Sequence, residues 1–89
     1  MIEREVTIVN RLGLHARAAA KLVQTTGGFK SRVTLISDSE EIDGKSILGI
    51  LLLAAAQGSR MIVRTEGVDE VEALNAIADL IANRFGEES

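Results

Sequence analysis

Segments with strand periodicity alternate with segments of helical character along all 89 residues of this chain. Apolar and polar residues alternate over Ile2–Val9 and again over Phe29–Ser37, as in strands with one buried face. The turn residues 38–39 let the chain return as a short antiparallel strand over Glu40–Asp43. Arg60–Glu66 has the same strand character. These four segments predict an antiparallel sheet that includes at least one hairpin.

Three helices are predicted between and after these strands. The alanine-rich segment Ala16–Thr26 has high helical propensity and stops at Gly27 and Gly28. A short, very apolar helix is expected over Ile47–Gln57, and a third over Asp69–Arg84. The first helix offers Ala19, Ala20, Leu22 and Val23 to the sheet, and the third carries an apolar stripe of Val71, Leu74, Ile77, Ala78, Ile81 and Phe85. The order β-α-β-β-α-β-α predicts a single α+β domain over residues 1–89, in which helices cover one face of an antiparallel sheet.

The composition excludes several classes of function. An apolar content of 46% with 26% charged residues fits a globular protein. A net charge of −3 and the absence of Trp and Tyr argue against nucleic-acid binding. Without Cys and with one His, no metal site and no cofactor are expected. The longest apolar run, Ile47–Ala56, is shorter than the roughly 20 residues that span a bilayer, so the expected location is the cytoplasm.

His15, the only histidine, stands where the first helix should begin. A first helical turn carries a partial positive charge and normally attracts acidic residues, yet here it holds His15 and Arg17. This pattern favours a phosphate site, in which the backbone N–H groups of Ala16 and Arg17 and the Arg17 guanidinium would hold the anion. A neutral imidazole nitrogen could also accept the phosphoryl group. The alternatives, left open by the residues alone, are an incidental loop or N-cap histidine and a solvated surface arginine.

Ser46 is a second candidate polar site. It precedes the apolar helix and is expected to act as its N-cap, which is typically worth about 1 kcal/mol. A hydroxyl at an exposed helix start, preceded by Lys45, is also a plausible target of a kinase. The helix that follows has more apolar residues than one buried face can hold. Ile47, Leu48 and Leu51 are therefore expected to be exposed as a docking surface for a partner, the alternative being that the helix is deeply buried.

Two of these segments resemble the histidine-containing phosphocarrier protein (HPr) family of the bacterial phosphoenolpyruvate-dependent sugar phosphotransferase system. Gly13–Ala20, with His15 and Arg17, is similar to the family's phosphorylation site. Lys45–Ala54, with Ser46, is similar to its regulatory-serine segment. The resemblance extends over essentially the whole chain in length and element order. It implies an open-faced β-sandwich, a four-stranded antiparallel sheet with three helices on one face.

The resemblance also implies a function, that of a phosphoryl carrier with no substrate turnover of its own. Enzyme I would place a phosphoryl group on Nδ1 of His15, and IIA domains of sugar permeases would receive it. Arg17 would steady the group. An HPr kinase/phosphorylase would modify Ser46, which weakens the interaction with enzyme I and can serve carbon catabolite repression. A carrier of this size is expected to be a monomer without nucleic-acid partners or membrane insertion.

Position 18 departs from the family pattern. Many members have proline directly after the arginine, whereas this chain has Ala18. Proline suits the first turn of a helix, and its loss removes a conformational lock on the loop around His15. A nitrogen-related regulatory branch of the phosphotransferase system therefore stays open, as does a non-catalytic interaction domain in which His15 has no chemistry.

Overall fold

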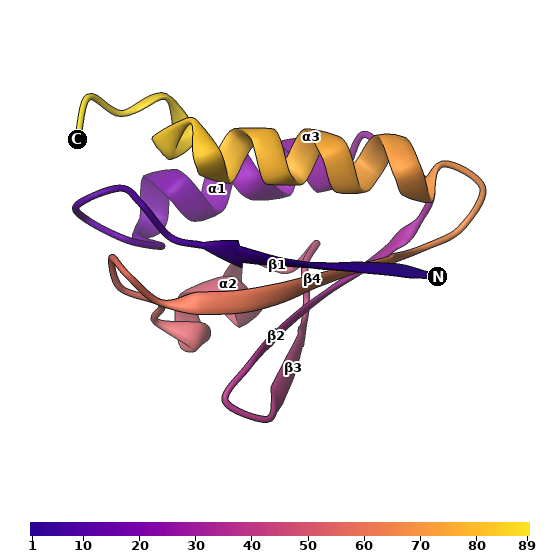
Figure 1. Ribbon diagram of the computed structural model, residues 1–89, viewed down its shortest axis with the longest axis horizontal. Coiled ribbons are helices and arrows are strands. Elements are labelled where there is room, and N and C mark those ends of the chain that lie inside the picture. The colour runs from indigo at the N-terminus through magenta and orange to yellow at the C-terminus, as the bar shows by residue number, and fades with distance from the viewer.

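The computed structural model describes residues 1–89 and has the predicted order of elements (Figure 1). The strands and helices, in chain order, are β1 (Ile2–Thr7), α1 (Ala16–Thr26), β2 (Arg32–Ser37), β3 (Glu40–Asp43), α2 (Ile47–Leu53), β4 (Arg60–Glu66) and α3 (Glu70–Ala82), followed by the 3-10 turn η1 (Arg84–Gly86). The predicted fold class, an α+β open-faced sandwich, is confirmed.

The four strands form one antiparallel sheet in the order β1-β4-β2-β3. The register places Leu35 of β2 opposite both Val63 of β4 and Ile42 of β3. These residues share the face that the helices cover, whereas the other face is open and charged. On the open face, Arg64 pairs with Glu3 at 2.6 Å and with Glu41 at 3.4 Å.

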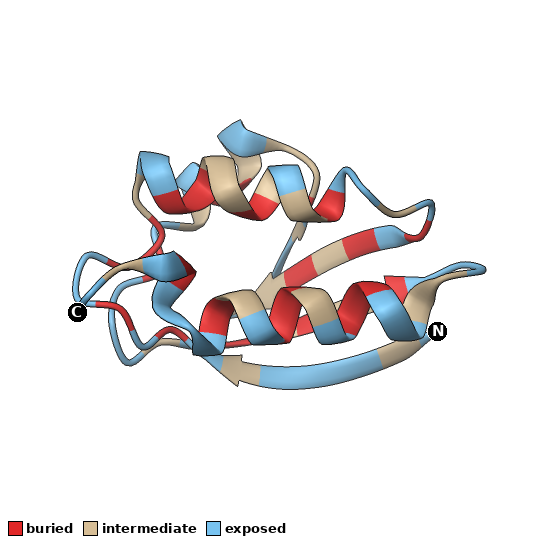
Figure 2. Ribbon diagram, turned by 90° about the horizontal axis from the view of Figure 1, so that it is seen from above, coloured by how far each residue is buried: buried red, intermediate tan, exposed pale blue.

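A single core lies between the sheet and the helices (Figure 2). Helix α3 packs on β1 and β4, α2 packs on β3, and α1 packs on both α2 and α3. The largest fully buried apolar side chains come from strands, helices, the loop after β1 and the C-terminal turn: Ile8, Leu22, Val33, Leu35, Ile50, Val63, Ile77, Ile81 and Phe85.

Two strands are shorter than the alternating pattern predicts. β1 ends at Thr7 instead of Val9, because Ile8 bonds through its N–H to Ser59 and through its C=O to Gly58, which lie in a turn. β2 begins at Arg32 instead of Phe29. The N–H groups of Lys30 and Ser31 donate to the Asp69 carboxylate, at 2.9 Å each, instead of to a strand.

The helices also differ from the prediction at their ends. α2 ends at Leu53 rather than Gln57, since Ala54 turns into the left-handed region at φ 52° and ends the helix. α3 runs over Glu70–Ala82 rather than Asp69–Arg84, and Asp69 is its N-cap residue.

One residue of the predicted apolar stripe of α3 does not face the core. Val71 is 53% exposed, because at 100° per residue it lies about 90° around α3 from the centre of the buried stripe. In α1, the predicted Ala19 and Leu22 are fully buried, and Ala20 and Val23 are partly buried. Ala18 is also fully buried and was not predicted to be.

Candidate functional site

The loop before α1 places His15 beside the end of α2. Gly13 has φ +65°, and a Cβ there would lie 2.4 Å from the carbonyl oxygen of Ala55, so the close approach requires glycine. The N–H of Leu14 donates to the same Ala55 carbonyl at 2.9 Å, and the buried Asn10 amide donates to Gly13 O at 2.8 Å. The loop is therefore fixed to the segment that follows α2.

His15 is the N-cap residue of α1, in an extended conformation with φ −76° and ψ 178°. Its Nδ1 accepts a hydrogen bond from the N–H of Arg17 at 3.3 Å, and its side chain is 26% exposed. Since Nδ1 accepts, the proton of a neutral ring is on Nε2. The Nδ1 lone pair thus lies in the positive field of the helix N-terminus, where an anion is stabilised.

Sequence reasoning missed two residues on the other side of the ring: Glu87, which contacts the ring, and Asn10, which bonds to Glu87. The Nε2 atom of His15 lies 2.6 Å from Oε2 of Glu87, and the Asn10 amide donates to Oε1 of Glu87 at 2.8 Å. The hydrogen bond from Asn10, and then that from His15, lowers the pKa of the Glu87 carboxyl below its usual range. No local pattern in the sequence indicates these contacts, because Glu87 is 72 residues from His15.

The C-terminal turn that carries Glu87 has an unusual backbone. Arg84, Phe85 and Gly86 all have positive φ, at 58°, 54° and 79°. A left-handed conformation costs a non-glycine residue about 1–2 kcal/mol. Burial of the Phe85 ring, which is 1% exposed, offsets such a cost, and Nζ of Lys21 donates to the carbonyl of Phe85 at 2.6 Å. This turn lies at the same end of the molecule as the loop before α1 (Figure 1).

Arg17 and Ala16 occupy the first turn of α1, where the sequence places them. Both residues are exposed, and the Arg17 guanidinium forms no ion pair or hydrogen bond within the fold. The Ala16 N–H has no acceptor in the fold, and the first intrahelical donor is the N–H of Ala19, which bonds to His15 O at 2.9 Å. The donors expected to hold a phosphoryl group thus belong to the first turn of α1, whose Arg17 N–H bonds to Nδ1, although that role stays a prediction.

Ser46 caps α2 as predicted. Its Oγ accepts a hydrogen bond from the N–H of Gly49 at 3.1 Å. A helix of seven residues is about 10 Å long. Ser46 therefore lies about one helix length from the end of α2 that holds the His15 loop. A regulatory role for Ser46 stays a prediction.

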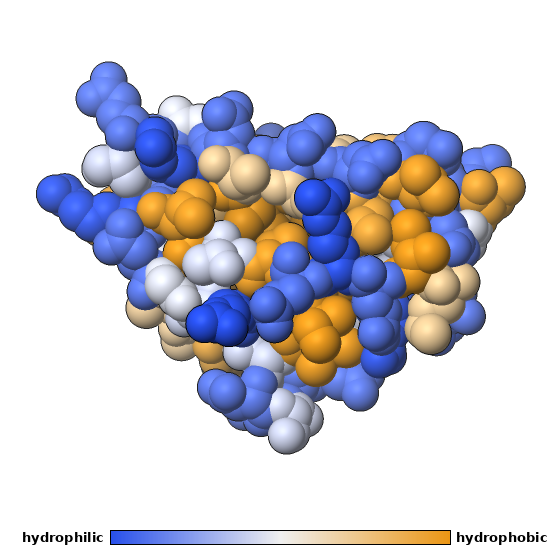
Figure 3. Space-filling model, viewed as in Figure 1, coloured by the Kyte–Doolittle hydropathy of each residue, from blue (hydrophilic) through white to orange (hydrophobic).

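Helix α2 exposes most of its apolar side chains. Ile47, Leu48 and Leu51 are 44%, 68% and 36% exposed, and only Ile50 is fully buried. Two further exposed residues were not predicted, Leu52 on α2 and Leu12 in the loop before α1. On the face shown in Figure 3, hydrophilic side chains lie between groups of apolar side chains. Whether α2 binds a partner stays a prediction.

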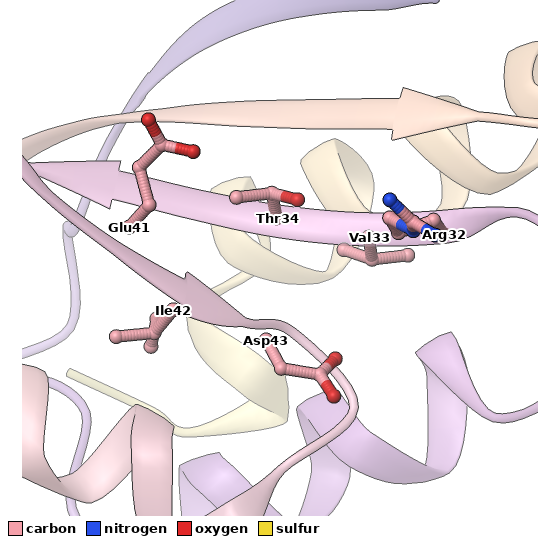
Figure 4. Close-up of a pocket in the computed structure, with 6 residues that line it drawn as sticks. All are labelled: Arg32, Val33, Thr34, Glu41, Ile42 and Asp43. Carbon is pink, nitrogen blue, oxygen red and sulfur yellow. The ribbon is translucent and has the colours of Figure 1, made fainter.

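The hollows of the surface lie away from His15. One, of about 320 Å³, is formed between β2 and β3 and is lined by Arg32, Val33, Thr34, Glu41, Ile42 and Asp43 (Figure 4). Its acidic groups already have partners in the fold, because Asp43 accepts from the N–H of Lys45 and Glu41 pairs with Arg64. A second, of about 290 Å³, lies between β1 and α3. His15 is thus part of an open surface site.

The structure shows neither a metal-binding cluster nor a membrane-spanning helix. No three His, Asp or Glu side chains are grouped as a metal site would require. None of the helices is long and apolar enough to cross a bilayer.

Comparison with known proteins identifies the family of this chain. A family model described as the "PTS HPr component phosphorylation site" matches residues 2–83. The phosphocarrier protein HPr of Cupriavidus necator is 52% identical over 87 residues, which cover 98% of each chain, and that of Xylella fastidiosa strain Temecula1 is 51% identical over the full length of both.

Solved structures are similar as well. The crystal structure of HPr-C-His from Thermoanaerobacter tengcongensis has a TM-score of 0.96 at 44% identity and covers both chains fully. The HPr of Bacillus anthracis strain Ames has a TM-score of 0.87 at 36% identity, over 90% of this chain and 95% of that one. The fold and these similarities define a small phosphocarrier protein. The chain belongs to the HPr family, the phosphocarrier proteins of the phosphotransferase system.

Proposed function

We propose that His15 accepts a phosphoryl group from enzyme I on Nδ1 and passes it to IIA domains of sugar permeases. The observation that carries this proposal is the position of Nδ1, which accepts the Arg17 N–H at the start of α1. In this proposal the chain is a carrier in the cytoplasm and not an enzyme with its own turnover. Phosphoenolpyruvate is the original donor.

The transfer would proceed by attack of the Nδ1 lone pair on the phosphorus atom. A bond between Nδ1 and phosphorus forms while the bond between phosphorus and the donor breaks. The oxygens of the bound group would then be held by the N–H groups of Ala16 and Arg17 and by the Arg17 guanidinium, which has no competing partner in the fold. The dipole of α1 adds to this stabilisation.

An open site suits a carrier. Tight binding of the phosphoryl group in the ground state would slow its onward transfer. Arg17 and Ala16 are exposed, and His15 lies in neither hollow of the surface. Each partner could therefore supply the remaining contacts in turn.

The exposed side chains of Ile47, Leu48 and Leu51 are the proposed docking surface for these partners. Phosphorylation of Ser46 by an HPr kinase/phosphorylase would place a dianion at the start of α2, beside Ile47 and Leu48. The added charge would weaken binding of an acidic partner surface such as that proposed for enzyme I.

A reconstituted relay tests the proposal. Phosphoenolpyruvate labelled in its phosphoryl group is incubated with enzyme I and a IIA domain, with or without the protein. Label is expected on the IIA domain only when the wild-type protein is present, and the His15→Ala variant should not support it. Equal labelling of the IIA domain with the His15→Ala variant would contradict the proposal.

A further inference from the structure

We propose that Glu87 is a positioning residue for His15, which keeps the ring proton on Nε2 and leaves Nδ1 free as the acceptor. The kinetic part of this inference rests on the proposed function. The structural part concerns only the ring and its hydrogen bonds. Glu87 does not touch the phosphoryl group in this proposal, because it faces the opposite nitrogen.

The first support is the pair of hydrogen bonds on the two ring nitrogens. Nε2 lies 2.6 Å from a carboxylate oxygen of Glu87, and a carboxylate can only accept. Nδ1 lies 3.3 Å from the Arg17 N–H, which can only donate. Both contacts require the same tautomer, with the proton on Nε2 and the lone pair on Nδ1.

The second support is that Glu87 is itself held in place. The buried amide of Asn10 donates to Oε1 of Glu87 at 2.8 Å and to the carbonyl of Gly13 at 2.8 Å, so that one side chain joins Glu87 to the His15 loop. Because both of these partners are acceptors, they fix the orientation of the Asn10 amide. Hydrogen bonds of this kind behind a functional histidine set its tautomer and orientation.

The third support is the backbone that delivers Glu87. Arg84, Phe85 and Gly86 are all left-handed, and Phe85 is buried in the core. A disordered segment would require neither three left-handed residues in a row nor a buried phenylalanine ring. Strain of this kind persists where the surrounding structure holds it, and it is common at functional sites. The exposed neighbour Glu88 has no partner in the fold, which makes it a matched control.

The proton on Nε2 affects both the transfer of the phosphoryl group to His15 and its onward transfer from His15. When Nδ1 bonds to phosphorus and the bond to the donor breaks, a ring already protonated at Nε2 becomes cationic. The Glu87 carboxylate lies where it balances that charge. On onward transfer the bond between Nδ1 and phosphorus breaks, its electron pair returns to Nδ1, and the ring is neutral again with the same proton on Nε2. No other proton needs to move.

The test combines spectroscopy with kinetics on the Glu87→Ala and Glu88→Ala variants. Nitrogen-15 NMR of the neutral imidazole is expected to show the proton on Nε2 in the wild type and in Glu88→Ala, and a larger share on Nδ1 in Glu87→Ala. Phosphoryl transfer from phosphorylated enzyme I in a single turnover should slow about tenfold in Glu87→Ala and not in Glu88→Ala, a magnitude typical of such partners. A Glu87→Gln variant keeps the size of the side chain and removes its charge, and it should slow transfer as well.

Three results would overturn the inference. They are an unchanged tautomer ratio in Glu87→Ala, unchanged transfer in both Glu87 variants, and faster transfer, which would mean that Glu87 obstructs the site. If the wild type itself accepts no phosphoryl group, the proposed function fails, whereas the NMR result still decides whether Glu87 sets the tautomer. The two failures are therefore distinguishable.

Discussion

The two nitrogens of His15 have different surroundings, and this difference defines the site at the scale of single residues. Nδ1 faces the N-terminus of α1, where N–H groups and the exposed Arg17 can stabilise an anion. Nε2 faces the Glu87 carboxylate. The sequence predicts the first environment from the Gly13–Ala20 segment. It cannot predict the second, because that contact depends on how the C-terminal turn folds back.

Arg17 is expected to speed phosphoryl transfer without contributing much to stability. Its guanidinium has no partner within the fold, so Arg17→Ala should leave the free energy of unfolding within about 0.5 kcal/mol of wild type. Loss of a charge-assisted hydrogen bond, worth roughly 1.5–3 kcal/mol, predicts transfer slower by about 10- to 100-fold. Single-turnover kinetics with phosphorylated enzyme I measure the effect. Arg11→Ala, which removes an exposed arginine from the preceding loop, is the matched control, and equal rates for the two variants would refute the role.

At the scale of elements, local patterns predict which segments are strands and helices better than where they end. Alternation identifies β2, but Asp69 captures the N–H groups of Lys30 and Ser31 before the strand begins. Apolar composition identifies α2, but Ala54 ends it where the carbonyl of Ala55 receives the loop before α1. A partner distant in sequence sets the start of β2, and another bonds directly after the end of α2. Local propensity does not contain that information.

The position of Ser46 at the start of α2 predicts two effects of substitution that can be measured separately, one on stability and one on the binding of enzyme I. Ser46→Ala removes the cap on the Gly49 N–H and should lower the free energy of unfolding by about 1 kcal/mol, measured by urea denaturation. Ser46→Asp keeps a capping acceptor, so it should be more stable than Ser46→Ala, yet it should bind enzyme I more weakly than wild type. The loss of affinity should diminish as salt is added. Affinity equal to that of wild type at low salt would count against the switch.

The hydrogen-bond pattern of α1 predicts that proline is tolerated at position 18. The first intrahelical donor is the N–H of Ala19, so a proline in place of Ala18 removes no helical hydrogen bond. Ala18→Pro should raise the free energy of unfolding by about 0.4–1 kcal/mol, because proline restricts the unfolded chain. Chemical denaturation measures the change. A loss of stability would show instead that the fully buried environment of Ala18 cannot accommodate the ring.

At the scale of the whole molecule, carboxylates join distant parts of the chain. Hydrogen bonds from the Ser31 hydroxyl and the Lys30 N–H lower the pKa of Asp69. Bonds from the Gly67 N–H and then from the N-terminal amine lower the pKa of Glu70, and the Asn10 amide lowers that of Glu87. Each folded-state pKa lies below its ordinary value, so the unfolded chain binds more protons in acid. The stability from these groups is present above their ordinary pKa values and is lost as the pH falls through the folded-state values.

The protein should therefore lose stability as the pH falls below about 4.5, near the ordinary pKa of a glutamate. Asp69→Asn should be less stable than wild type at neutral pH and should show a shallower decline in acid. Urea denaturation between pH 7 and pH 3 measures both effects. Asp79→Asn, at an exposed position of α3 without an ion pair, is the control, and its profile should follow that of wild type. Parallel profiles for Asp69→Asn and wild type would contradict the assignment.

The central claim is that His15 accepts the phosphoryl group, and intact-mass analysis tests it most directly. Wild type, His15→Ala and His15→Asn are each incubated with phosphoenolpyruvate and enzyme I, whose activity is verified on a known acceptor. Asn is a favoured N-cap residue, so His15→Asn keeps a cap on α1 while removing the ring nitrogen. The account predicts a single phosphoryl adduct on wild type, lost in acid, and none on either variant. No adduct on wild type, or the same adduct on His15→Asn, would contradict it.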